Sequence, residues 1–135
     1  RGNYHLVAAT ESQDISNYHL EAAIAYWHTT KDKNKWSHIL LLYDQLVRIE
    51  SSPQTALGRA FALSKVYGHE RAIIETEALK LENNAHYHAL LGYLYAPLEP
   101  STARHHYETA HRLSSSLAER QHLQREITRL RDAAS

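Results

Sequence analysis

The chain has 135 residues, the size of one domain, and it contains no Cys, so disulfides and thiolate metal sites are excluded and a reducing compartment is the simplest home. Lys plus Arg and Asp plus Glu both number 15, a balance that gives no broad charged surface for a nucleic acid or a membrane. No apolar run approaches the about 20 residues that a membrane-spanning helix needs, and no signal peptide is visible.

The first predicted elements are helices, and no stretch alternates as a strand would. Residues 1–14 are expected to be the tail of an upstream helix or a linker. The chain begins at Arg1 and has no Met, so we expect it to be a fragment of a longer protein. Apolar stripes of helical period predict one helix over 16–28 and a second over 35–50, joined by a polar connection.

The next pair of helices has clear start and stop signals. Ser52 is a good N-cap and Pro53 suits a first helical position, so a helix is predicted over 53–67. Gly68 is the expected C-terminal stop. A shorter helix is predicted over 69–80.

The last third of the chain repeats this arrangement. Helices are predicted over 85–96 and 101–113, with apolar residues on one face of each. The pair Ser116 and Glu119 has the spacing of a capping box, which predicts a final helix over 117–132. That helix is more polar than the others, as a terminal cap on a stack of helices should be.

Two short strings indicate how these helices associate. Leu57-Gly58-Arg59-Ala60-Phe61 and Leu91-Gly92-Tyr93-Leu94-Tyr95 share the pattern Leu-Gly-x-x-aromatic and lie 34 residues apart, the period of a tetratricopeptide repeat. Glycine lets two helices approach closely, and the aromatic residue three positions later is expected to fill the groove on the same face. The sequence therefore predicts an all-α fold, a tetratricopeptide-like stack of three helical hairpins plus a C-terminal capping helix, in a single domain over 15–133. A generic helical bundle is the alternative.

Three further strings carry a family resemblance. They are Tyr18-His-Leu-Glu-Ala-Ala-Ile-Ala-Tyr-Trp-His28, Trp36-x-x-Ile-x-x-Leu-Tyr-Asp-x-Leu46, and Ser52-Pro-x-x-Ala-Leu-Gly-Arg-Ala-x-Ala62. This pattern resembles the C-terminal helical extension of a group of extracytoplasmic-function (ECF-type) RNA polymerase sigma factors. The likeness covers about residues 15–130 and is most specific in these strings. Gly58 departs from it, since the family often has Asn there, and the middle repeat is shorter here.

The resemblance implies a function through protein contacts. The parent would be a bacterial, cytoplasmic sigma factor with two N-terminal promoter-reading helical domains, which this chain lacks and through which alone DNA contact is expected. The extension would regulate transcription initiation by binding the parent's own sigma domains, RNA polymerase or a regulator. No membrane and no small-molecule substrate are expected. A freestanding tetratricopeptide-like adaptor of an unrelated cytoplasmic complex is the alternative, and what precedes Arg1 would distinguish the two.

The residues offer little sign of chemistry. The 11 His residues are densest at His86 and His88 and at His105, His106 and His111, but such neighbours diverge on a helix and no HExxH motif is present. We therefore expect histidines on solvated faces, no metal site and no cofactor. No nucleophile elbow, phosphate-binding glycine loop or paired-acid motif appears, so no catalytic residue is assigned and the chain is not expected to be an enzyme.

The repeat register predicts a partner-binding groove. In a repeat stack the first helix of each hairpin lines the concave face, which forms a groove. If Leu57 and Leu91 occupy equivalent positions, then Arg59 and Tyr93, each two residues later, face that groove. An aromatic and charged groove suits a peptide or a protein domain, although an exposed surface without a partner is an equally good interpretation. The residues expected to line it are Tyr18, Glu21, His28, Arg59, His86 and Tyr93.

Overall fold

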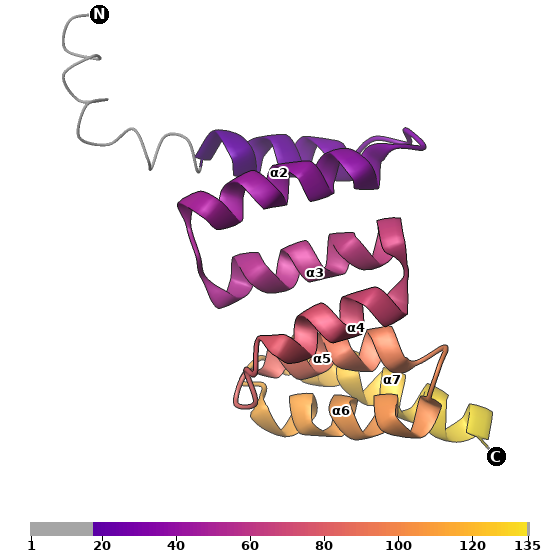
Figure 1. The fold of residues 1–135 in the computed structure, drawn as a ribbon. Coiled ribbons are helices and arrows are strands. Elements are labelled where there is room, and N and C mark those ends of the chain that lie inside the picture. Colours follow the sequence, from indigo (N-terminus) through magenta and orange to yellow (C-terminus); the bar gives the residue numbers. More distant parts are fainter. Residues whose placement is uncertain (1–17, 135) are drawn as a thin grey trace, which may run out of the picture. The chain divides into compact units, whose positions relative to one another are not determined.

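The computed structural model describes residues 18–134, and all regular structure in that range is helical, with no strand (Figure 1). The all-α expectation is thus confirmed. Two compact units divide the chain, with a boundary between Ala62 and Leu63, and each unit is described by itself. The single domain over 15–133 stays a prediction, and the expected tail over 1–14 lies outside the described residues.

The first unit contains a helix over residues 18–28, then α2 (Lys35–Ile49) and the first part of α3 (Pro53–Tyr67). The turn after residue 28 closes the end of the first helix, because threonine hydroxyls bond its last carbonyls. Thr29 Oγ1 donates to the Tyr26 carbonyl at 2.7 Å, and Thr30 Oγ1 donates to the Trp27 carbonyl at 3.0 Å. These bonds satisfy acceptors that a helix end leaves open.

Aromatic contacts join the helices of the first unit. The Trp27 ring stacks on His38 with centroids 4.1 Å apart, so the helix over 18–28 and α2 form the predicted first hairpin. Trp36 of α2 meets Phe61 of α3 edge-on at 5.4 Å. Ile39, also on α2, is fully buried.

Capping signals set the bounds of α3. The Thr55 amide donates to Ser52 Oγ at 3.2 Å, which confirms the predicted N-cap, and Pro53 is the first helical residue. At the other end the Gly68 amide donates to the Ser64 carbonyl at 3.0 Å. Gly68 has φ +103°, a conformation that glycine adopts without strain, so the predicted stop is confirmed as well.

The second unit holds α4 (His69–Ala78), α5 (Ala85–Tyr95), α6 (Pro100–Leu113) and α7 (Leu117–Ala134). Consecutive helices pack against each other: α4 on α5, α5 on α6 and α6 on α7 (Figure 1). The hairpin of α5 and α6 and the C-terminal helix beside it are therefore present as predicted. None of the helices in the described part of the chain is long and apolar enough to cross a membrane.

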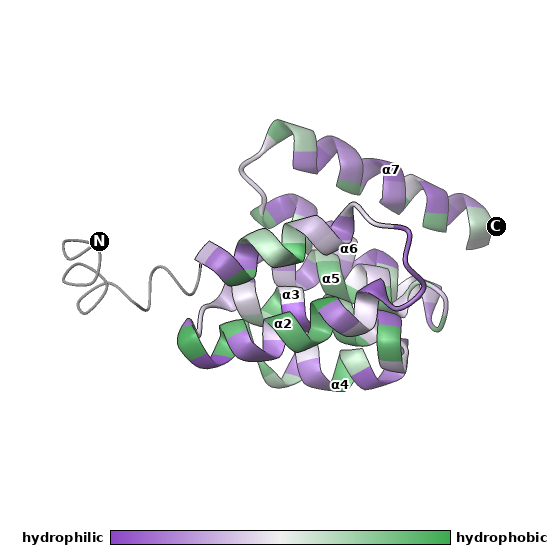
Figure 2. Cartoon of the chain, turned by 90° about the horizontal axis from the view of Figure 1, so that it is seen from above, coloured by the Kyte–Doolittle hydropathy of each residue, from purple (hydrophilic) through white to green (hydrophobic). Residues whose placement is uncertain are grey.

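The last helix behaves as a cover on α6. Figure 2 shows α7 as mostly hydrophilic, with separate hydrophobic positions along its length. Those positions bury their side chains with residues of α6 in one cluster, which removes apolar surface from water. The buried members are Ala103, Tyr107, Ala110, Leu123, Ile127 and Leu130.

Both glycines of the repeated pattern lie against an aromatic ring of another helix. A Cβ atom on Gly92 would come within 2.8 Å of Tyr107 in α6, and one on Gly58 would come within 2.6 Å of the Tyr43 hydroxyl in α2. The predicted close approach of helices is confirmed. The rings that fill it differ from the expected ones, because Phe61 packs on Trp36, as described above, and the ring that lies against each glycine belongs to a neighbouring helix.

Candidate functional site

Four of the expected groove residues lie in the first unit, and they have different surroundings. Tyr18 is 70% exposed, and Glu21 lines a cavity. The His28 ring meets Trp36 edge-on at 5.3 Å. Arg59 Nε donates to Asp44 Oδ1 at 2.6 Å, so this guanidinium already has an anionic partner on α2.

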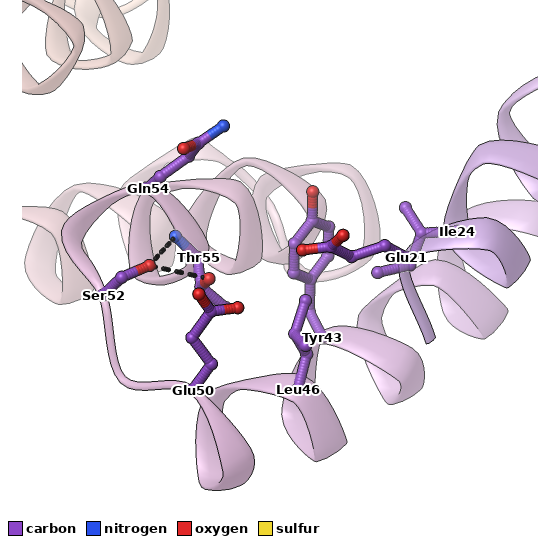
Figure 3. A pocket seen from close by; sticks show the side chains of 8 residues that line it. All are labelled: Glu21, Ile24, Tyr43, Leu46, Glu50, Ser52, Gln54 and Thr55. Carbon is purple, nitrogen blue, oxygen red and sulfur yellow. Dashed lines mark hydrogen bonds between the residues drawn. The ribbon is translucent and has the colours of Figure 1, made fainter. Parts of the chain in front are cut away.

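A small cavity of about 200 Å³ lies between the helix over 18–28, α2 and the start of α3 (Figure 3). Glu21 and the ring of Tyr43 lie side by side at one end of it, and Glu50 faces Ser52 and Thr55 at the other. Ser52 Oγ and Thr55 Oγ1 are 2.9 Å apart and bond to each other. The eight residues that line the cavity are Glu21, Ile24, Tyr43, Leu46, Glu50, Ser52, Gln54 and Thr55.

Two carboxylates, those of Glu21 and Glu50, line this cavity. Burial is the main cause that raises the pKa of the Tyr43 hydroxyl, and the nearby Glu21 carboxylate raises it further. None of the eight lining side chains is cationic. Among the residues that the structure describes, no group of three or more His, Asp or Glu side chains could hold a metal ion.

The other two expected groove residues lie on α5, in the second unit. His86 and Tyr93 are seven residues apart, about two helical turns, and so share a face. His86 Nε2 lies 3.5 Å from Glu119 Oε2 of α7. The Tyr93 ring instead lies 5.1 Å from the His69 ring of α4, with Lys65 Nζ 5.4 Å from its centroid. One face of α5 thus serves two different sets of neighbours.

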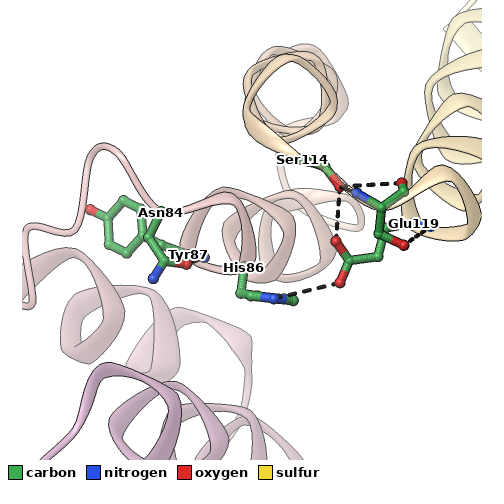
Figure 4. Close-up of polar contacts among 6 residues, drawn as sticks. Asn84, His86, Tyr87, Ser114 and Glu119 are labelled. Carbon is green, nitrogen blue, oxygen red and sulfur yellow. Dashed lines mark hydrogen bonds and ion pairs between the residues drawn. The ribbon is translucent and has the colours of Figure 1, made fainter.

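The capping box at the start of α7 forms only in part (Figure 4). The Glu119 amide donates to Ser116 Oγ at 3.2 Å, as predicted. The Glu119 carboxylate, however, accepts a hydrogen bond from Ser114 Oγ at 2.9 Å, and the Ser116 amide donates to Ser114 Oγ at 3.3 Å. Ser114 is buried, and a buried hydroxyl needs an acceptor, so it takes the carboxylate that the box would have used.

One of these histidines, His88, is not on a solvated face, so for it the expectation was wrong, whereas His106 is partly exposed as expected. His88 is only 9% exposed, and its Nδ1 lies 3.1 Å from Nδ1 of His106 on α6. His88 Nε2 lies 2.7 Å from the Glu82 carbonyl. Histidines one or two residues apart diverge on a single helix, as predicted, but the packing of α5 on α6 brings His88 and His106 together. We call His88 and His106 the histidine pair.

An exposed apolar patch on the second unit was not predicted from the sequence. Tyr67 is 59% exposed, Ile74 69% and Leu98 45%, and all three line one shallow hollow of about 770 Å³. We call these three residues the apolar patch. The Arg71 guanidinium lies 5.2 Å from the centroid of the Tyr67 ring, and Arg71 lines the same hollow. Ile74 could have indicated the patch from the sequence, because it is a large apolar residue outside the buried stripe of its helix.

Comparisons with known proteins give little functional information. No protein-family model matches the chain, and no solved structure matches it. An uncharacterized protein of Rhizobium meliloti (strain 1021) is 33% identical over 119 residues, which cover 84% of this chain and 28% of that protein. The chain therefore spans little more than a quarter of the length of this curated relative.

Proposed function

We propose that this region is the C-terminal regulatory and protein-interaction domain of a bacterial ECF-type RNA polymerase sigma factor. It acts in transcription initiation, in the cytoplasm, through protein contacts and without catalysis. The strings between Tyr18 and Ala62 support the sigma-factor assignment through their resemblance to the family. The apolar patch carries the protein-contact role.

The apolar patch has the features of a contact surface for a protein. Its members Tyr67, Ile74 and Leu98 keep large apolar areas in water, and each Å² that a partner covers contributes roughly 25 cal/mol. Glu70 and Arg71 line the same hollow, so charged side chains border the apolar ones. Apolar patches with polar rims mark interaction sites on proteins. The partner is the parent's own sigma domains, RNA polymerase or a regulatory protein.

The length of the relative is compatible with this proposal. Nearly three quarters of the Rhizobium meliloti protein lies outside the part that aligns with this chain. That protein therefore has room for further domains, as a sigma factor with a C-terminal extension requires. In the proposed parent, DNA contact is made by those further domains.

A freestanding tetratricopeptide-like adaptor of another cytoplasmic complex is the second candidate. The helical hairpins and the apolar patch suit it equally well. The coding sequence before Arg1 distinguishes the candidates: two helical promoter-reading domains support the sigma factor, whereas an unrelated protein or a start codon supports the adaptor.

A pair of matched variants tests the contact role in the full-length protein. Ile74→Glu places a charge in the apolar patch, while Leu41→Glu places one on α2 at a residue that is 60% exposed and outside the patch. Both sites are exposed, so neither variant should unfold the protein. We expect Ile74→Glu to change promoter-specific transcription and polymerase association several-fold and Leu41→Glu to leave both unchanged. Equal behaviour of Ile74→Glu and the unmodified protein would reject the patch as the contact surface.

A further inference from the structure

We propose that the histidine pair is a proton-sensitive contact between α5 and α6, stable with one hydrogen between the two rings and broken when both rings are protonated. The two Nδ1 atoms are 3.1 Å apart, which is hydrogen-bond distance. Such a bond needs an N–H on one ring and a lone pair on the other. The number of protons on the pair therefore decides whether the contact can exist.

The backbone sets which ring donates. The Glu82 carbonyl can only accept, so His88 Nε2 must carry a hydrogen to bond to it at 2.7 Å. A neutral His88 then presents a lone pair at Nδ1. The hydrogen in the contact consequently belongs to His106 Nδ1 at neutral pH.

Protonation changes the contact in two steps. One added proton is tolerated, because His88 can donate from Nδ1 while His106 carries its hydrogen on Nε2 and presents a lone pair. A second proton puts an N–H on both facing nitrogens and two positive charges at 3.1 Å. No lone pair is left between the rings, so they must separate.

Few facing groups can compensate for two charges. From α4, the Glu77 carboxylate is the nearby anion, but it already accepts a hydrogen bond from Tyr95 at 2.7 Å. His105, the neighbour of His106 on α6, adds a further cation when it is protonated. Glu77 therefore opposes the separation only in part.

The remaining neighbours come from α5 and from the α4–α5 connection. Tyr87 meets the His88 ring edge-on at 5.0 Å and is neutral near pH 7. Glu82 lies in the connection and offers its carbonyl to His88. The Glu99 carboxylate, beyond the end of α5, contributes to the raised pKa of Tyr95.

Separation of the rings would affect three helices. The His106 ring is stacked on Tyr95 at 5.7 Å and 10°, and the Tyr95 hydroxyl is bonded to Glu77 of α4. The histidine pair thus lies where α4, α5 and α6 meet. Acidification should loosen this junction while the buried side chains of α7 keep their apolar contact with α6.

The sign of the pH effect follows from His106. Burial foremost, then His88 and His105, hold the pKa of His106 below the usual 6.5. The unfolded chain therefore takes up the proton first. The contribution to stability is complete above pH 6.5 and is lost as the pH falls from there through the folded pKa.

Two histidine variants test this inference by stability measurements. His106→Gln retains a side-chain N–H for the His88 lone pair but cannot be protonated. Between about pH 7.5 and pH 5, we expect the unfolding equilibrium constant of the unmodified protein to rise several-fold more than that of His106→Gln, because only the unmodified protein loses the contact. His122→Gln is the matched control, since it removes an exposed histidine of α7 that is not among the groups acting on His106, and it should behave as the unmodified protein. The same pH dependence in all three proteins would overturn the inference.

A second measurement covers the case in which His106→Gln does not fold. Nitrogen NMR of the unmodified protein reports which ring nitrogen carries hydrogen. At pH about 7.5 we expect the hydrogen on Nε2 of His88 and on Nδ1 of His106. The opposite tautomer on His88 would overturn the inference.

Discussion

Gly92 lies so close to Tyr107 that a Cβ atom on it would meet three ring carbons, including Cγ, at 2.8 Å. Gly58 stands in the same sequence pattern, but a Cβ atom there would meet the tip of Tyr43, at its hydroxyl and the two nearest carbons. Tyr107 is 4% exposed and fixed in the α6–α7 cluster. Tyr43 borders the cavity of the first unit. The two glycines therefore have different freedom to accept a side chain.

We predict that Gly92→Ala lowers the free energy of unfolding by about 1–3 kcal/mol, because the base of the Tyr107 ring cannot move away. Gly58→Ala should be close to neutral. There the tip of Tyr43 can rotate into the cavity, and alanine gains about 1 kcal/mol of helix propensity over glycine. Denaturant unfolding of both variants measures the difference. An equal loss in the free energy of unfolding for Gly92→Ala and Gly58→Ala would contradict this prediction.

The burial of Leu91 on α5 predicts that a charge at this position destabilises the second unit. Leu91 is 1% exposed, so Leu91→Asp strands a carboxylate among apolar side chains and should lower the free energy of unfolding by several kcal/mol. Ile74→Asp makes the same kind of change at an exposed residue of α4 and should stay within about 0.5 kcal/mol of the unmodified protein. A Leu91→Asp midpoint equal to that of the unmodified protein would mean that this face is assigned wrongly.

Tyr107 should make the protein sensitive to alkali. Burial is the largest cause that raises its pKa to about 12, whereas the unfolded chain loses this proton near pH 10. The stabilising effect is complete below pH 10 and is lost as the pH rises from there to about 12. The loss amounts to about 2–3 kcal/mol for this residue. In Tyr107→Phe, stability measured over the same range should fall by that much less, and an unchanged alkaline loss would contradict the assignment.

Lys80 follows α4 with φ +52°, a left-handed conformation that costs a non-glycine residue roughly 1–2 kcal/mol. Lys80→Gly removes this cost and loses about 0.5–1 kcal/mol in chain entropy, so a small rise in melting temperature is expected. Gln45→Gly, in the exposed interior of α2, is the control and should lower stability by about 1 kcal/mol. A fall in the melting temperature of Lys80→Gly would contradict the reasoning.

The bounds of the helices could be predicted from the sequence because their signals are local. Ser52 and Gly68 act on amides and carbonyls within a few residues, and α3 has the predicted bounds. The capping box shows the limit of this reasoning. Its local half forms, but the Glu119 carboxylate bonds to Ser114, whose need for an acceptor depends on burial that the motif does not encode.

Contacts between helices could not be predicted in the same way, because the register of one helix against the next is set by packing. His88 and His106 lie 18 residues apart and meet only through the α5–α6 seam. Arg59 was expected in an open groove, yet it pairs with Asp44 of α2. The groove itself stays a prediction. Ile74 was overlooked because it lies beside the buried Ile73 on the same helix.

Promoter-specific transcription with purified RNA polymerase tests the central claim most directly. The full-length protein should be compared with a form that lacks residues 18–134, with both at the same concentration and on the same promoter. The proposed regulatory role predicts that removal of the region changes the amount of transcript several-fold. Equal transcript from the two proteins would contradict it.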